Sequence, residues 1–187
     1  KRKSISFKNN NRRDLIMYVK LGPAGRKNRA EKVVIDDTDV WNLDHSLALI
    51  IAPALKILKE KKQGAPFVHN EDVPKFLRAT EEEIKEHWDG GDSDEHYFDR
   101  WDYVMSEMIF AFESKLEDWE EQFASGENDV SFVEIPDKKD EEGEPLWTWK
   151  HGPNHTREYD VEGSIKYQDR ITKGFKLFGK YYEGLWD

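Results

Sequence analysis

The sequence predicts an α+β fold in which long amphipathic helices pack on small antiparallel β elements, an N-terminal sheet and a hairpin at 129–150. Three observations support this fold class. Apolar residues recur every three or four positions over 98–123, whereas apolar and polar residues alternate at 129–135 and 145–150. Seven Trp, seven Tyr and ten Phe supply apolar surface for a core, although 36% of the residues are charged.

A chain of 187 residues fits a domain of ordinary size, so we expect a single domain at 1–187. Its expected parts are a basic N-terminal β arm at 1–38, a helical core at 43–124 and 161–183, and a β-hairpin insertion at 129–150. We expect no membrane-spanning segment, because the longest apolar run has only nine residues and a span needs roughly 20.

Short strands are expected in the first third of the chain. Residues 4–7, 15–21 and 32–35 are rich in β-forming side chains, and the turn sequence GPAG at 22–25 follows the second of them. Together they predict a small antiparallel sheet at the N-terminus.

A buried helix is expected from about Leu43 to Lys62. Acidic residues gather at its start and Lys residues at its end, as the helix dipole favours, and the helix is apolar almost all round. A short helix to Trp88 follows, for which Thr80 and Glu83 form a capping box.

One long helix is expected from about His96 to Ala124, with Gly126 as its stop. Its apolar face follows helical spacing over about seven turns and consists of Phe98, Trp101, Met105, Met108, Phe112, Leu116, Trp119 and Phe123. Such a face packs in the protein's own core, or part of it closes a homo-oligomer.

The last third predicts a hairpin and a helix. Strands at 129–135 and 145–150 enclose the charged loop 137–144, and a helix follows from about Val161 to Tyr182. Asp160 precedes this helix and is suited to be its N-cap.

Charge is segregated along the chain. Residues 1–32 contain eleven Lys or Arg and two acidic residues, a formal charge of +9, whereas the other 155 residues carry −19. A basic arm can attract an anion locally, but a strongly acidic body repels a long polyanion. We therefore expect no long nucleic acid as a partner, while a small phosphate ligand, which meets only the local field, stays compatible with this charge distribution.

The last helix carries a second cationic group, with Lys166, Arg170, Lys173 and Lys180 at gaps of four, three and seven residues. Aromatic residues flank them. Cations hold phosphates and rings stack on bases, so this pattern suits a ligand with both groups. The same cations also suit a solvated helix end that complements the dipole.

No catalytic or metal-binding pattern accompanies these charges. The chain has no Cys and lacks a P-loop, a dinucleotide fingerprint and a nucleophile elbow. His151 and His155 are separated by Gly152-Pro153, which excludes a shared helical face. We expect no enzyme, no cofactor and no metal site.

Several motifs resemble a widespread family of small tailed-phage proteins, over roughly residues 40–125 and 160–187. The motifs are Trp41–Ala48 (WNLDHSLA), Lys62–Val68 (KQGAPFV), Glu71–Pro74 (EDVP), Arg100–Asp102 (RWD), Glu107–Phe112 (EMIFAF) and Phe178–Trp186 (FGKYYEGLW). The family in turn resembles immune-evasion sponges, which are homo-oligomers that sequester the cyclic nucleotide signals of the CBASS defence system without cleaving them.

This resemblance implies a phage protein of the host cytoplasm whose ligand is a cyclic oligonucleotide such as a cyclic dinucleotide, and which forms a homo-oligomer. It maps no binding residues onto this chain, so the candidates come from charge and aromatic chemistry. They are Arg170, Lys173 and Lys180 for phosphates, Trp41, Tyr181 or Trp186 for bases, Arg12 and Arg13 for a neighbouring subunit's site, and His45, which also suits a capping or packing role.

Two other functions stay open. The protein could be a structural or host-protein-binding component of the phage, whose acidic faces at 81–95 and 113–121 mimic DNA. It could also be an enzyme of nucleotide metabolism, although no motif supports that reading.

Overall fold

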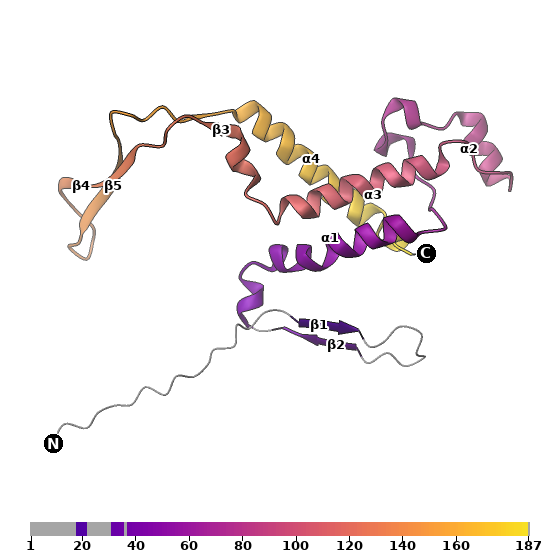
Figure 1. The fold of residues 1–187 in the computed structure, drawn as a ribbon, viewed down its shortest axis with the longest axis horizontal. Coiled ribbons are helices and arrows are strands. Elements are labelled where there is room, and N and C mark those ends of the chain that lie inside the picture. The colour runs from indigo at the N-terminus through magenta and orange to yellow at the C-terminus, as the bar shows by residue number, and fades with distance from the viewer. Residues whose placement is uncertain (1–17, 22–30, 36, 187) are drawn as a thin grey trace, which may run out of the picture.

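The computed structural model describes residues 18–21, 31–35 and 37–186. Three helices dominate it (Figure 1): α1 at Leu43–Lys61, α3 at Tyr97–Ser114 and α4 at Val161–Lys180. Helix α3 packs against both α1 and α4 and is therefore the centre of the fold. Small antiparallel strand pairs complete the α+β architecture that the sequence predicts.

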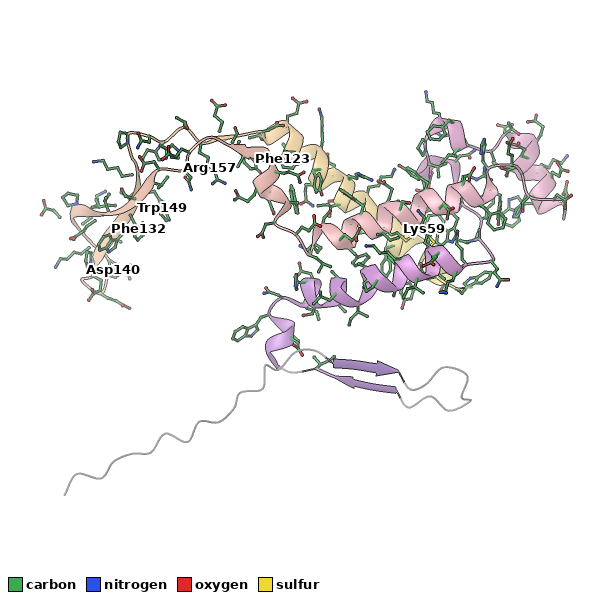
Figure 2. The ribbon with its side chains drawn as sticks, viewed as in Figure 1. Lys59, Phe123, Phe132, Asp140, Trp149 and Arg157 are labelled. Atoms are coloured by element: carbon green, nitrogen blue, oxygen red, sulfur yellow. The ribbon has the colours of Figure 1, made fainter. Side chains whose placement is uncertain are left out.

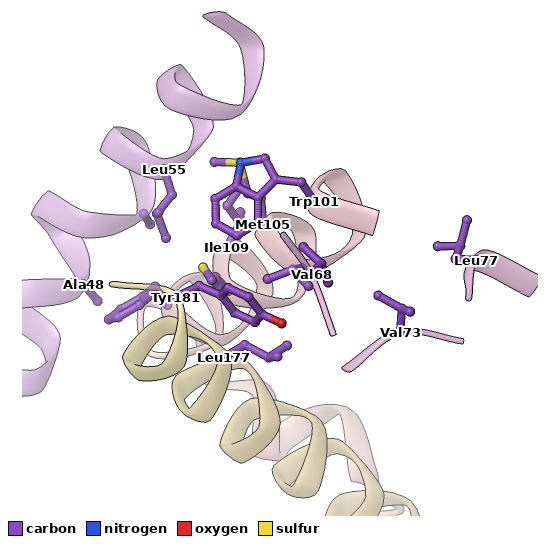
Figure 3. Packing of buried hydrophobic residues seen from close by; sticks show 14 residues of the cluster. Ala48, Leu55, Val68, Val73, Leu77, Trp101, Met105, Ile109, Leu177 and Tyr181 are labelled. Carbon is purple, nitrogen blue, oxygen red and sulfur yellow. The ribbon is translucent and has the colours of Figure 1, made fainter. Parts of the chain in front are cut away.

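Helix α3 supplies the largest share of the buried core (Figure 3). Its Trp101, Val104, Met105 and Met108 are completely inaccessible to solvent. Other elements contribute the rest of this cluster, with Ala48, Ala52 and Leu55 from α1, Val68, Val73 and Leu77 from the loop before α2, and Leu177 and Tyr181 from the end of α4. Because both flanking helices bury side chains on α3, packing rather than helix propensity holds the bundle together.

The single helix predicted over 96–124 is wrong in its second half. Helix α3 ends at Ser114, and a 3₁₀ helix at Trp119–Phe123 follows after a turn. The Ser114 hydroxyl donates to the Phe110 carbonyl at 2.8 Å, and the Leu116 amide bonds to the Glu113 carbonyl three residues back. Such bonds compete with the regular helical ladder and end it.

The apolar pattern of 98–123 still identifies a buried side after the helix ends. Trp119 stacks on Tyr167 of α4 with ring centres 5.0 Å apart, and Phe123 meets the edge of the same ring at 5.7 Å. At the other end of the pattern, Phe98 is half exposed. The chain therefore turns at 115–118 so that its last aromatic residues follow α4 instead of continuing along α3.

The predicted strand pairing at the N-terminus is confirmed where the structure describes it. Strand β1 at Tyr18–Leu21 pairs antiparallel with β2 at Glu31–Val34, with Tyr18 opposite Val34. The expected strand at 4–7 and the turn at 22–25 lie outside the described residues.

The predicted hairpin is also confirmed and is longer than expected. Strand β4 at Val130–Lys139 pairs with β5 at Pro145–His151, and its register is irregular between Glu134 and Lys139. It projects away from the helices (Figures 1 and 2) and is joined to them through β3 at Ala124–Ser125, which pairs with β6 at Glu158–Tyr159.

Short helical turns lie between α1 and α3: 3₁₀ turns at Asn70–Asp72 and Lys75–Leu77, then α2 at Glu81–Trp88. Further 3₁₀ turns precede α1 at Asp37–Val40 and follow α4 at Tyr182–Gly184. The capping box of α2 is confirmed, and so is Asp160 as N-cap of α4, which accepts from the Gly163 amide at 2.9 Å. Within the described residues, none of the helices has the length and apolar character needed to cross a membrane.

Candidate functional site

The central cations of α4 form contacts with α3. Arg170 donates to both carboxylate oxygens of Glu107, at 2.7 to 3.2 Å, and its guanidinium lies 3.8 Å from the centre of the Phe110 ring. The hydrogen bonds to Glu107 raise the pKa of Arg170. Lys173 donates to the Tyr103 hydroxyl at 3.0 Å. In this structure two of the three predicted phosphate ligands, Arg170 and Lys173, thus join two helices of the same chain.

Lys180 and Tyr181, at the end of α4, bind the loop before α2. The Lys180 ammonium lies 2.6 Å from carboxylate oxygens of both Glu71 and Asp72. Burial favours the neutral amine, but the hydrogen bonds to Asp72 and Glu71 outweigh it and raise the pKa of Lys180. The Tyr181 hydroxyl donates to Asp72 at 2.6 Å and accepts from the His69 amide at 3.0 Å.

Trp41 and His45 lie at the opposite end of the bundle. Trp41 is 82% exposed just before α1, and the His45 Nδ1 donates to the Lys115 carbonyl at 3.1 Å, next to the end of α3. The hydrogen bond to that carbonyl gives His45 the packing role that the sequence also allows. Arg12 and Arg13 lie outside the described residues.

The predicted site residues are therefore not brought together within one chain. His45 contacts Lys115, whereas the Tyr181 ring packs on Trp101. Trp101 and Lys115 are fourteen residues apart on and just beyond α3, which is about 20 Å along a helix. Among the predicted residues that the structure describes, Lys180 and Tyr181 lie beside the cleft formed by the loop before α2, because they bond to Glu71 and His69, which line it.

That cleft has a volume of about 600 Å³ and lies between the loop before α2 and α2 itself. Its lining combines aromatic and aliphatic side chains with one cation, one amide and one carboxylate: Phe67, His69, Asn70, Glu71, Arg78, Ile84 and Trp88. Ligand clefts in proteins commonly measure 300 to 1,000 Å³. We call it the 67–88 cleft.

Aromatic rings form one wall of the 67–88 cleft. Trp88 is 68% exposed, and its ring centre lies 5.3 Å from that of Phe67. Phe67 in turn stacks on His87 at 5.5 Å and meets the edge of His69 at 5.4 Å. These contacts fix the rings while leaving the indole of Trp88 accessible, which suits stacking with a flat heterocycle.

Arg78 supplies the cation of the cleft. It is exposed, and among the described residues no ion pair or hydrogen bond of its guanidinium is seen, in contrast to Arg170. Lys180 lies next to the cleft but is bound by Glu71, one of the lining residues. An unpaired guanidinium beside exposed rings offers a bidentate donor to a phosphate oxygen pair.

Hydrogen bonds hold the loop of the cleft in shape. The Asn70 side chain donates to the Ala79 carbonyl at 2.7 Å and accepts from the Ala79 amide at 2.8 Å. The capping box then fixes the start of α2, because Thr80 and Glu83 bond to each other's backbone amides. A ligand entering here meets a preformed site, so little ordering free energy is lost on binding.

Comparisons with known proteins give no match. No protein-family model, no curated protein and no solved structure matches the chain. In the part of the chain that the structure describes, there is also no group of three or more His, Cys, Asp or Glu that could hold a metal ion. The candidate function therefore depends on the cleft itself.

Sequence reasoning missed Arg78 and Trp88. Two of the quoted motifs, Lys62–Val68 and Glu71–Pro74, do border the cleft, but they show no periodic or charged pattern that identifies a site. An isolated Arg and the last residue of a short helix carry no recognisable spacing. Arg78 and Trp88 line the same cleft because the chain turns between them, and this proximity is seen only in the structure.

Proposed function

We propose that the protein binds and sequesters a small ligand that carries both a heterocyclic base and a phosphate, without cleaving it. Cyclic oligonucleotide second messengers, such as cyclic dinucleotides, are the proposed class, and the host cytoplasm of an infecting phage is the proposed location. The observation that carries this proposal is the unpaired Arg78 beside the exposed indole of Trp88 in the 67–88 cleft.

The chemistry of the cleft supports such a ligand over a purely apolar one. Base–aromatic stacking contributes about 1 to 3 kcal/mol per base, and a bidentate bond from Arg to phosphate adds orientation as well as affinity. Lys180 binds both Glu71, which lines the cleft, and Asp72 beside it, and so offsets one of their two negative charges. Sequestration needs affinity alone, so this site requires no nucleophile or general base.

Isothermal titration calorimetry with a panel of cyclic dinucleotides and trinucleotides tests the proposal. We expect saturable binding of at least one compound to the full chain. Trp88→Ala and Arg78→Ala should each weaken binding at least tenfold. The first removes the ring on which a base stacks, and the second removes the donor to the phosphate.

Two neighbouring residues provide matched controls. Phe76 is 74% exposed in the same segment but does not line the cleft, and Lys75 is an exposed cation beside it. Phe76→Ala and Lys75→Ala should bind as the unchanged protein does. No heat with any compound, or equal losses in the control variants, would overturn the proposal.

The second candidate function is that of a protein-binding component of the phage. It is favoured by the projecting β4–β5 hairpin, on which Phe132, Trp147 and Trp149 are each about half exposed or more. The first turn of α2 also exposes the carboxylates of Glu81 and Glu82, as a mimic of DNA would require. Pull-down from host lysate separates the two functions. Only the protein-binding function predicts that the unchanged protein recovers a specific host protein and that Trp149→Ala does not.

A further inference from the structure

The β4–β5 hairpin presents an aromatic face around a carboxylate. Phe132 lies opposite Trp149, and Glu134 lies opposite Trp147, in the antiparallel register. Because side chains alternate along each strand, these four residues share one face of the hairpin. We call them the 132–149 face.

The rings of the 132–149 face pack on one another and stay accessible. Phe132 lies nearly parallel to Trp147 with ring centres 5.6 Å apart, and its ring centre is 4.8 Å from that of Trp149. Trp147 is 49% exposed and Trp149 is 69% exposed, on a hairpin that projects from the helices (Figure 2). Clustered, uncovered aromatic area of this kind is typical of a surface that binds another molecule.

The charge of the hairpin favours a cationic partner. Residues 129–151 contain seven Asp or Glu and three Lys, a formal charge of −4. In the described part of the chain, no ion pair includes a residue of this segment. Glu134 is exposed, and its carboxylate accepts no hydrogen bond from another described residue. Such a surface repels acidic proteins and nucleic acids and attracts a basic segment.

Aromatic rings beside a carboxylate suit Arg in particular. A guanidinium stacks flat on a ring and donates two parallel hydrogen bonds to a carboxylate, which the ammonium group of Lys cannot do. The protein itself contains this arrangement, because Arg170 lies 3.8 Å from the centre of the Phe110 ring and donates to both carboxylate oxygens of Glu107. The 132–149 face offers the same two partners, rings and a carboxylate, for an Arg from another molecule.

The outer edge of β5 is open to a further strand. Among the described residues β5 pairs with β4 alone, and a two-stranded hairpin is only marginally stable in water. Pro136, which has no N–H, and Asp137, with a φ of 60°, interrupt the outer edge of β4. The register of β5 is regular from Trp147 to His151. An extended peptide can therefore add a strand beside β5.

We propose that an extended segment of a partner protein, with Arg at alternate positions, adds to β5 as a third strand. Alternate side chains of the added strand lie on the side of the 132–149 face, beside Trp147 and Trp149. One guanidinium stacks on Trp147 and reaches Glu134 across it, because the two residues lie directly opposite each other. The 132–149 face then carries the protein-binding function, on which this inference rests, and the 67–88 cleft takes no part.

Indole N–H signals in the NMR spectrum of the full chain, labelled with nitrogen-15, test where such a segment binds. The seven Trp give seven signals, which Phe substitutions of single Trp residues assign. The probe is a capped heptapeptide in which Arg alternates with Thr. We expect it to shift the signals of Trp147 and Trp149 and to leave that of Trp88 in place. Unmoved signals of Trp147 and Trp149 would overturn the proposal.

Changes in the probe test its chemistry, with affinity measured by fluorescence anisotropy at constant salt. Citrulline in place of Arg keeps the shape of the side chain but removes its charge, and should weaken binding at least tenfold. Lys in place of Arg keeps the charge but loses the planar donor pair, and should weaken binding at least threefold. Equal affinity of either peptide would contradict recognition of a guanidinium.

Methylation of backbone nitrogens tests the added strand. Alternate N–H groups of an edge strand point toward its neighbour, and the others point to solvent. Methylating one alternate set should therefore prevent binding of the probe, whereas methylating the other set should be tolerated. Equal effects of the two sets would overturn strand addition.

Glu134→Gln tests the carboxylate without disturbing the rings, so the hairpin keeps its aromatic cluster. It should weaken the Arg peptide about tenfold. Glu120→Gln removes the same charge at an exposed position outside the hairpin and should change affinity less than twofold. Circular dichroism of both variants must match that of the unchanged protein. Equal losses in both variants would show a general effect of net charge and contradict a role for Glu134.

These outcomes are separable from those of the other proposals. A chain that recovers a host protein through Trp149 but binds no Arg peptide overturns this inference and leaves the protein-binding function in place. Binding of a cyclic dinucleotide in the 67–88 cleft shifts the signal of Trp88 instead. Signals of Trp147 and Trp149 that move with protein concentration alone would show a second copy of the chain on this face, which also overturns the proposal.

Discussion

Arg170 of α4 and Glu107 of α3 form a bidentate ion pair that joins the two helices, with Arg170 also lying over the Phe110 ring. The Glu107 side chain is only 8% exposed, whereas that of Arg170 is 49% exposed. The pair therefore couples a nearly buried carboxylate to a cation at the surface. Its main contribution is to compensate the buried charge of Glu107.

Arg170→Ala should lower the free energy of unfolding by about 2 kcal/mol, because it leaves a buried carboxylate without its charged donor. The loss stays below that of a fully buried pair, since water already screens half of Arg170. Urea denaturation measures it. Lys166→Ala, which removes an exposed pair with Glu162 on the same helix, should have little effect, and equal losses would contradict this role of Arg170.

Gly174→Ala should destabilise the protein, whereas Gly179→Ala in the same helix should stabilise it. A Cβ at position 174 would lie 2.5 Å from the Cβ of Ala111, and closer still to the Glu107 carbonyl, so α3 and α4 would have to separate. A Cβ at position 179 meets nothing within 4 Å. There, Ala gains roughly 0.5 to 1 kcal/mol of helix propensity. Thermal unfolding compares the two, and shifts of the same sign would contradict the close packing of these helices.

The ion pair of Asp94 with the buried Arg100 should make stability depend on acid pH. The Arg100 hydrogen bonds lower the pKa of Asp94 below its ordinary value of 3.8. A lowered folded-state pKa means that this stabilisation is complete above about pH 4 and is lost as pH falls through the folded value.

Asp94→Asn should therefore have a lower free energy of unfolding than the unchanged protein at pH 7. The difference between the two free energies should become smaller below pH 4. Guanidinium denaturation across pH 2.5 to 7 measures this difference. Asp92→Asn makes the same charge change at a nearby exposed position and serves as the control. If the difference in unfolding free energy between Asp94→Asn and the unchanged protein stayed constant down to pH 2.5, the charge of Asp94 would not be the cause of the lost stability.

Glu71→Gln should increase affinity for a phosphate ligand in the 67–88 cleft. The substitution removes one negative charge from the cleft wall, and Lys180 keeps Asp72 as its partner. Removing a nearby like charge strengthens binding of an anion most at low salt. Calorimetry at low and high salt checks both the direction and the salt dependence, and unchanged or weaker binding at low salt would count against an anionic ligand here.

The sequence predicted local structure well where its signal is local. The Thr80–Glu83 capping box and the Asp160 cap depend on residues three positions apart, and both occur as expected. The prediction of one long helix was wrong because apolar spacing indicates which side chains are buried and not where a helix ends. Buried side chains continue past Ser114, although the backbone turns there.

The candidate site could not be predicted in the same way. Arg170 and Lys180 bind carboxylates 63 and 109 residues away, so their spacing on α4 contains no information about those partners. Arg78 belongs to no periodic series of cationic or aromatic residues in the sequence. Which cations stay free is decided by tertiary pairing.

Mass spectrometry of heat-released ligand tests the central claim most directly. The full chain is incubated with a cyclic dinucleotide that it binds, freed of excess by gel filtration and heated. We expect the intact cyclic compound to be recovered from the unchanged protein and from Phe76→Ala, and little of it from Trp88→Ala. Recovery of linear or smaller products, or equal recovery from Trp88→Ala, would contradict sequestration in the 67–88 cleft.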